Sequence, residues 1–167
     1  MYALRRHVAL LLSAAAVFSA FPVQAWVETR VTAHAAVVDA ERNGSATVTH
    51  ELGIRLRGGP LSELQLAGVD SDAEPLTDAT LICTDDPKFG TVPLTVERRA
   101  DGSLHIAVER ERGLRTGSYV FRFGYRTQLL KRDLIRRVGS SVELRWVGPR
   151  FDDGLDSARV TFRFPEA

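Results

Sequence analysis

Apolar and polar residues alternate with a period of two along most of the chain after residue 26, which is the pattern of β-strands with one buried face and one solvated face. The clearest example is residues 46–56, where every second residue is apolar apart from His50. A strand rich in Val, Thr and Ala precedes it at 27–38, and Asn43-Gly44 lies between the two. This dipeptide predicts a hairpin, with a loop longer than two residues.

The middle of the chain predicts shorter strands. A strand near 64–69 is followed by an acidic loop at 70–78, whose carboxylates we interpret as solvated turn acids because the full calcium-loop pattern is missing. An apolar piece at 81–83 precedes a second hairpin, 92–96 with 104–108, around Asp101-Gly102. Pro93 has no amide hydrogen for a ladder, so we expect its strand at a sheet edge.

The last third contains the most aromatic strand. Four aromatic residues alternate over 119–125, and we expect this strand at the centre of the sheet. Residues 129–138 are ambiguous, since Leu130, Leu134 and Val138 have the spacing of a short helix. Two strands close the chain, 142–147 and 158–164.

These segments predict an all-β protein of about eight or nine strands with at most one short helix. Their turn spacing favours an antiparallel immunoglobulin-like β-sandwich, with a small barrel as the alternative. Removing residues 1–25 from the 167 leaves 142, the size of one domain, so we expect a single β-sandwich domain over 26–167.

Residues 1–25 have the composition of a signal peptide. Arg5-Arg6 form a basic start, an apolar run follows from Val8 to Phe21, and Val23-Gln24-Ala25 resembles a cleavage site. The sequence therefore predicts export to the periplasm or the outside of the cell, with cleavage before Trp26. No later segment is long and apolar enough for a transmembrane helix.

Charge and motifs exclude several classes of function. The chain has 22 basic and 21 acidic side chains, and without Arg5 and Arg6 the basic count falls to 20, which argues against a nucleic-acid binder. We find no catalytic motif, cofactor motif or metal-ligand spacing, and expect no cofactor and no enzyme. Cys83 is the only cysteine and is interpreted as a small buried hydrophobe; an intermolecular bridge or a reactive thiol is the alternative. We expect His50 to be held by backbone or a nearby threonine; a pH-sensing or ligand role is the alternative.

One stretch is locally basic. Arg122 and Arg126 share the polar face of the aromatic strand, and further basic residues follow it closely. The candidate partner-binding patch contains Arg122, Arg126, Lys131, Arg132, Arg136 and Arg137. It becomes one surface if 128–138 folds back beside the aromatic strand, and it would then suit an envelope protein or an anionic surface. A solvated sheet face is the alternative.

Three segments carry a family resemblance. They are NGSATVTHELGIRL, GSYVFRFGYRTQLL and VELRWVGPRFDDGLDSARVTFRFP. Their strand and turn patterns resemble the N-terminal extracytoplasmic domain of the DUF2207 family of predicted bacterial membrane proteins. The resemblance implies a β-sandwich outside the cytoplasmic membrane, either as a stand-alone relative or as the N-terminal part of a longer membrane protein. It brings no established chemistry.

Taken together, these observations favour a non-enzymatic interaction or structural module of the bacterial cell envelope. The alternative is a small carbohydrate- or peptide-binding domain. An exposed cluster of Trp and Tyr on a concave sheet would favour sugar binding, whereas a flat arginine-rich face would favour a protein or anionic partner.

Overall fold

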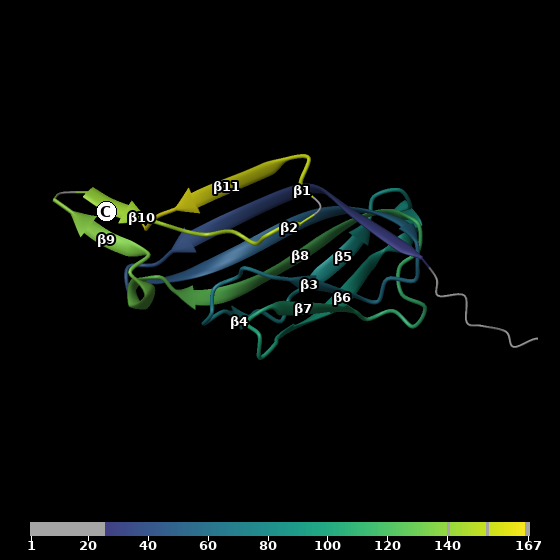
Figure 1. Ribbon diagram of the computed structural model, residues 1–167, viewed down its shortest axis with the longest axis horizontal. Helices are drawn as coiled ribbons and strands as arrows, with labels where there is room; N and C mark the ends of the chain where they lie inside the picture. Colours follow the sequence, from purple (N-terminus) through teal and green to yellow (C-terminus); the bar gives the residue numbers. More distant parts are fainter. Residues whose placement is uncertain (1–25, 140, 153, 166–167) are drawn as a thin grey trace, which may run out of the picture.

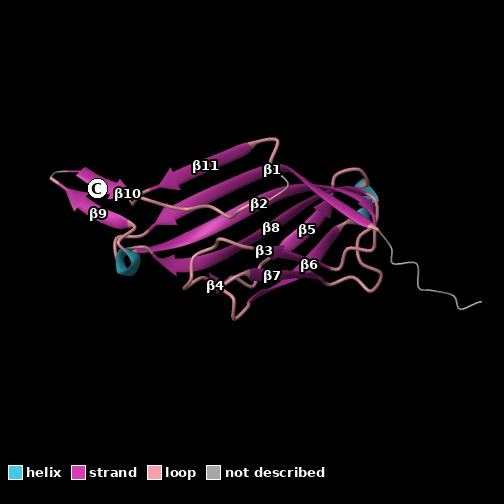
Figure 2. Cartoon of the chain, viewed as in Figure 1, coloured by secondary structure: helices cyan, strands magenta, loops and turns pink. Residues whose placement is uncertain are grey.

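A computed structural model describes residues 26–139, 141–152 and 154–165, and over these ranges the chain is built almost entirely from β-strands (Figures 1 and 2). The all-β prediction is confirmed. The predicted signal peptide, residues 1–25, lies outside the described residues. No helix in the described part combines the length and the apolar character needed to cross a membrane.

The two longest strands form the predicted hairpin. β1 (Val27–Ala40) pairs antiparallel with β2 (Ser45–Gly58), and residues 41–44 connect them. Gly44 has a φ of 82°, a left-handed conformation that glycine adopts without strain, and the Asn43 side chain accepts a hydrogen bond from the Ser45 amide at 2.8 Å. The predicted turn signal and the loop longer than two residues are therefore confirmed.

The sheet continues through the aromatic strand into a second layer. Its strand order is β11-β1-β2-β8-β5-β6-β7-β3, with β4 beside β8. The remaining strands are β3 (Glu63–Leu66), β4 (Glu74–Pro75), β5 (Thr80–Cys83), β6 (Thr91–Arg98), β7 (Leu104–Val108), β8 (Gly117–Gln128), β9 (Ile135–Val138), β10 (Ser141–Leu144) and β11 (Ala158–Arg163). The described ranges thus contain eleven strands, more than the predicted eight or nine. The two strands that were not predicted, β4 and β9, are too short to give a periodic signal.

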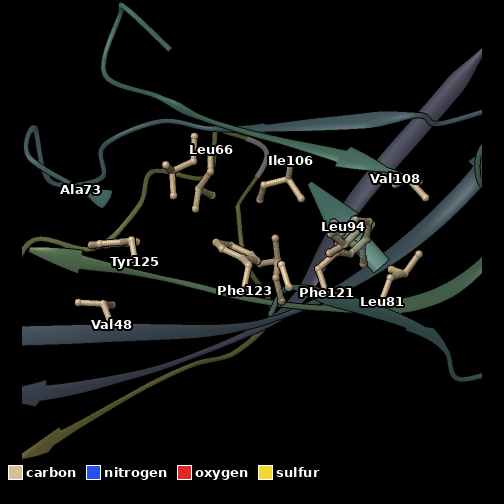
Figure 3. Packing of buried hydrophobic residues seen from close by; sticks show 14 of the residues in the cluster. Val48, Leu66, Ala73, Leu81, Leu94, Ile106, Val108, Phe121, Phe123 and Tyr125 are labelled. Carbon is tan, nitrogen blue, oxygen red and sulfur yellow. The ribbon is translucent and has the colours of Figure 1, made fainter. Parts of the chain in front are cut away.

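The core lies between the two layers. The inner face of β8 has Phe121 and Tyr125 fully buried, and Phe123 is 4% exposed. Figure 3 shows Leu66 and Ile106 of the β3–β7 layer facing these aromatic side chains. The prediction that β8 is central, with its aromatic residues in the core, is confirmed.

The prediction that Pro93 places its strand at a sheet edge was wrong. β6 lies between β5 and β7 and is not an edge strand. β5 pairs with residues up to Pro93, whereas β7 pairs with residues from Leu94 onward. Pro93 thus occupies the corner at which β6 passes from one layer to the other, where a missing amide donor is tolerated.

The acidic loop 70–78 also differs from its prediction as solvated turn acids. Asp70 is 4% exposed, and the Tyr125 hydroxyl donates to one of its oxygens at 3.5 Å. Asp72 accepts from the Thr127 hydroxyl at 2.8 Å and from the Gln128 amide at 2.9 Å. These carboxylates attach the loop to β8, because buried polar groups require partners.

The C-terminal third contains two further corrections. A short 3-10 turn, η2 (Leu130–Arg132), leads into the β9–β10 hairpin, so the helix alternative for 129–138 was wrong. β11 then pairs with β1 in parallel, which makes the sheet mixed where an antiparallel one was predicted. Figure 1 shows β11 at the edge of the sheet and β9–β10 projecting beyond its end. The immunoglobulin-like arrangement stays a prediction.

Candidate interaction surface

The inner face of the sheet ends in exposed apolar side chains at β11. Phe162 is in register with Val38, which pairs with Val48, which pairs with Tyr125. The last three are fully buried, whereas Phe162 is 42% exposed. The row of apolar side chains thus continues from buried positions on β8, β2 and β1 to an exposed position on β11.

The neighbouring row repeats this arrangement. Val160 is in register with Ala36, which pairs with His50. Ala36 and His50 are buried, but Val160 is 42% exposed and Phe164, just beyond the strand, is 53% exposed. We call Val160, Phe162 and Phe164 the edge strip.

A groove continues from the edge strip. It has a volume of about 310 Å³ and is lined mainly by apolar side chains, among them Ala40, Leu130, Ile135, Val142 and Phe164. Its walls come from the end of β1, from η2 and from the β9–β10 hairpin. The hairpin is attached to the sheet by the Leu130 amide, which donates to the Gly44 carbonyl at 3.1 Å.

The outer face of β11 is basic. Arg159 and Arg163 are exposed and alternate with the apolar residues of the edge strip. Arg163 is in register with Asp39, and Arg159 is in register with Ala35. Within the described ranges, neither arginine forms an ion pair.

The six residues of the candidate basic patch lie in two places, because 128–138 does not fold back beside β8. Arg122 and Arg126 are exposed on the outer face of β8. The Arg122 guanidinium is 3.0 Å from a Glu51 oxygen, and Arg126 lies opposite Glu74. Both positive charges therefore have acidic neighbours.

The other four are at the hairpin end of the molecule. Lys131 and Arg132 belong to η2, whereas Arg136 and Arg137 are neighbours on β9 and so point to opposite faces. Arg136 is 2.6 Å from Glu143, and its hydrogen bond lowers the pKa of that carboxyl. A role for these residues in binding stays a prediction.

A buried histidine pair lies beneath the edge of the sheet. His34 Nε2 is 2.9 Å from His50 Nδ1, so one neutral ring donates and the other accepts. Burial lowers the pKa of His50 to about 3, with a further contribution from His34, and burial also lowers the pKa of His34. The partner of His50 is thus His34 and not the backbone or threonine that we expected. Both histidines occupy apolar-face positions of one predicted hairpin, which is the signal that could have linked them.

Aromatic rings surround this pair. The His50 ring stacks on Phe123 and Tyr125 with centroids 5.1 and 5.5 Å apart, and Trp146 lies 6.2 Å away. Nε2 of His50 and Nε1 of Trp146 are buried and make no hydrogen bond with any described residue. The predicted strand 142–147 ends at Leu144, so Trp146 follows it and packs against the core.

Other candidate chemistry is dispersed. Cys83 is a half-buried free thiol at the end of β5, less buried than predicted. His105 is 2.8 Å from Glu63 on the second layer. No group of three or more His, Cys, Asp or Glu side chains within the described ranges could hold a metal ion.

No protein-family model matches this chain, and no curated protein matches it either.

Proposed function

We propose that this protein is a non-enzymatic interaction module of the bacterial cell envelope that binds a partner protein through the edge strip. One observation carries the proposal: rows of side chains that are buried on β8, β2 and β1 end in exposed Val160 and Phe162 on β11. Contiguous exposed apolar side chains on a folded domain are typical of protein interaction sites.

The compartment is inferred from the leader. The basic start, apolar run and small-residue end of residues 1–25 support export. The resemblance to the DUF2207 extracytoplasmic domain agrees with this location. The module then acts either by itself or as the N-terminal part of a longer membrane protein.

The alternative was a carbohydrate- or peptide-binding domain, and a peptide has more support here than a sugar. Sugar binding would be favoured by an exposed cluster of Trp and Tyr. Trp26 is 67% exposed, but Tyr119 and Tyr125 are buried and Trp146 is half-buried against the core. A peptide instead needs a strand edge or an apolar groove. β11 and its adjoining groove provide both.

Site-specific crosslinking in living cells tests the proposal. A photoreactive amino acid would replace Phe162, and in a matched control it would replace Arg98, which is exposed on the other layer. After irradiation we expect a discrete adduct with an envelope protein from position 162 and none from 98. The same adducts from both positions, or none from 162, would contradict the proposal.

A further inference from the structure

We propose that β11 binds its partner by strand addition, and that the partner segment is an extended chain in which apolar residues alternate with acidic ones. This inference rests on the proposed function and specifies its partner. Three features of β11 support it: its backbone edge, the chemistry of its two faces, and the groove at its end.

The first feature is a strand with one paired edge. β11 is six residues long and pairs only with β1 among the described strands. Alternate amides and carbonyls of an edge strand point away from its neighbour and can pair with another chain. All six residues of β11 are exposed, so an added strand could reach this edge.

The second feature is the apolar inner face. A strand added beside β11 would place every second side chain next to Val160 and Phe162. Apolar side chains at these positions would extend the rows that already run from Tyr125 and Phe123 through β2 and β1. They would also remove the 42% exposed surface of Val160 and Phe162 from water.

The third feature is the charge of the outer face. The intervening side chains of an added strand would lie beside Arg159, Thr161 and Arg163. Opposite charges on neighbouring strands stabilise pairing, and like charges oppose it. Arg163 has Asp39 in register on the β1 side, whereas among the described strands the free edge of β11 offers neither arginine an acidic neighbour. Since the two arginines form no ion pair within the described ranges, acidic residues on an added strand suit these positions best.

The same charges disfavour a second copy of this chain as the partner. If two copies of β11 paired antiparallel about Thr161, Arg159 of each copy would face Arg163 of the other. Such a pair would bring like charges together twice across one short interface. Natural proteins use charged residues on edge strands in this way to prevent self-association.

The groove adds a site for one more apolar side chain. Phe164 both ends the edge strip and lines the groove, together with Ala40, Ile135 and Val142. A partner segment that extends past the end of β11 would therefore reach an apolar groove of about 310 Å³. A terminal Leu or Phe on the partner segment would be accommodated there.

A peptide-binding assay with the purified full-length protein tests the inference. The probe is an end-blocked, fluorescein-labelled peptide, Glu-Val-Glu-Val-Glu-Val-Glu, followed by fluorescence anisotropy. One comparison peptide replaces every Glu with Lys, and another replaces the central Val with Pro, which cannot donate to a ladder. We expect the acidic peptide to bind. Each comparison peptide should bind at least about tenfold more weakly than the acidic peptide.

Variants assign the binding to β11. Arg159→Glu combined with Arg163→Glu should reverse the preference, so that the lysine peptide binds more tightly than the acidic one. Arg98→Glu combined with Arg112→Glu changes two exposed arginines elsewhere and alters net charge equally, and it should leave the preference unchanged. Phe162→Thr retains strand propensity and should lower the affinity for both the acidic peptide and the lysine peptide. Unfolding curves of each variant establish that it is folded.

Several results would overturn the inference. The wild-type protein could bind the acidic and lysine peptides equally, or the Arg159/Arg163 variant could keep the wild-type preference. The protein could instead form dimers that Phe162→Thr abolishes, or bind only to vesicles of anionic phospholipid. If the peptides fail but crosslinks from position 162 persist, strand addition is wrong and the proposed function stands. If the crosslinks also fail, the proposed function is wrong as well.

Discussion

Replacing His50 with Phe should remove much of the pH dependence of folding stability. Folding buries His50 against Phe123 and Tyr125 and lowers its pKa to about 3. In the unfolded chain the same ring has a pKa of about 6.5. Between these values the unfolded chain binds a proton that the folded protein excludes, so the free energy of unfolding falls as the pH falls.

The size of the effect follows from linkage. Each pH unit inside the window costs about 1.4 kcal/mol per histidine that stays neutral in the fold. At pH 6.5 the unfolded ring is only half protonated, so between pH 6.5 and 4.5 His50 alone should cost about 2 kcal/mol. His34, whose pKa is also lowered, adds in the same direction. Against a typical domain stability of about 5–15 kcal/mol, this is a readily measured loss.

Urea denaturation at a series of pH values and constant ionic strength measures this loss in the free energy of unfolding. The pKa of Glu143 and that of Asp101 are lowered mainly by hydrogen bonds from Arg136 and Ser103. Such carboxyls contribute stability above their unfolded pKa of about 4 and lose it below, so data above pH 4.5 isolate the histidines. His50→Phe should reduce the change in the free energy of unfolding with pH. The control variant, His105→Asn on the second layer, should show the same change as the wild-type protein. A wild-type stability that stays constant between pH 6.5 and 4.5 would refute this reasoning.

Three further predictions concern packing, backbone and processing. Phe123→Ala should lower the free energy of unfolding by about 3–5 kcal/mol, whereas exposed Arg122→Ala should cost about 1 kcal/mol or less; similar losses for both would contradict the strand register. Gly58 and Gly102 both have positive φ, but a Cβ at 58 would lie 2.0 Å from the Trp26 carbonyl oxygen. Gly58→Ala should therefore lower the thermal unfolding temperature more than Gly102→Ala, and equal losses would refute the clash. N-terminal sequencing of the exported protein should begin at Trp26. Recovery of the protein in the cytoplasm with an intact Met1 would contradict the prediction that residues 1–25 are a cleaved signal peptide.

Local patterns predicted the fold as far as strands and faces. The alternation over 46–56 and the Asn43-Gly44 turn predicted the β1–β2 hairpin, and four alternating aromatic residues predicted β8 as the centre. These features depend on neighbours in sequence, since a period of two fixes which side chains share a face. The alternation over 119–125 also separates the aromatic face from the polar face, and Phe123 is buried beside exposed Arg122.

Features that depend on which strands become neighbours could not be predicted in this way. The alternation over 158–164 showed that Val160 and Phe162 share a face, but not that β11 would join β1 in parallel at an edge. Only that position leaves this apolar face exposed as the edge strip. Pro93 and Asp70 were misinterpreted for a similar reason, because their surroundings come from segments distant in sequence.

Amide hydrogen exchange along β11 tests the central claim most directly. The claim is that a partner segment adds to the outer edge of Ala158–Arg163. In the presence of saturating Glu/Val peptide, the β11 amides that point away from β1 should exchange more slowly, and those of β3 and β7 should be unchanged. Unchanged exchange in β11, or protection confined to the β3–β7 layer, would contradict the claim.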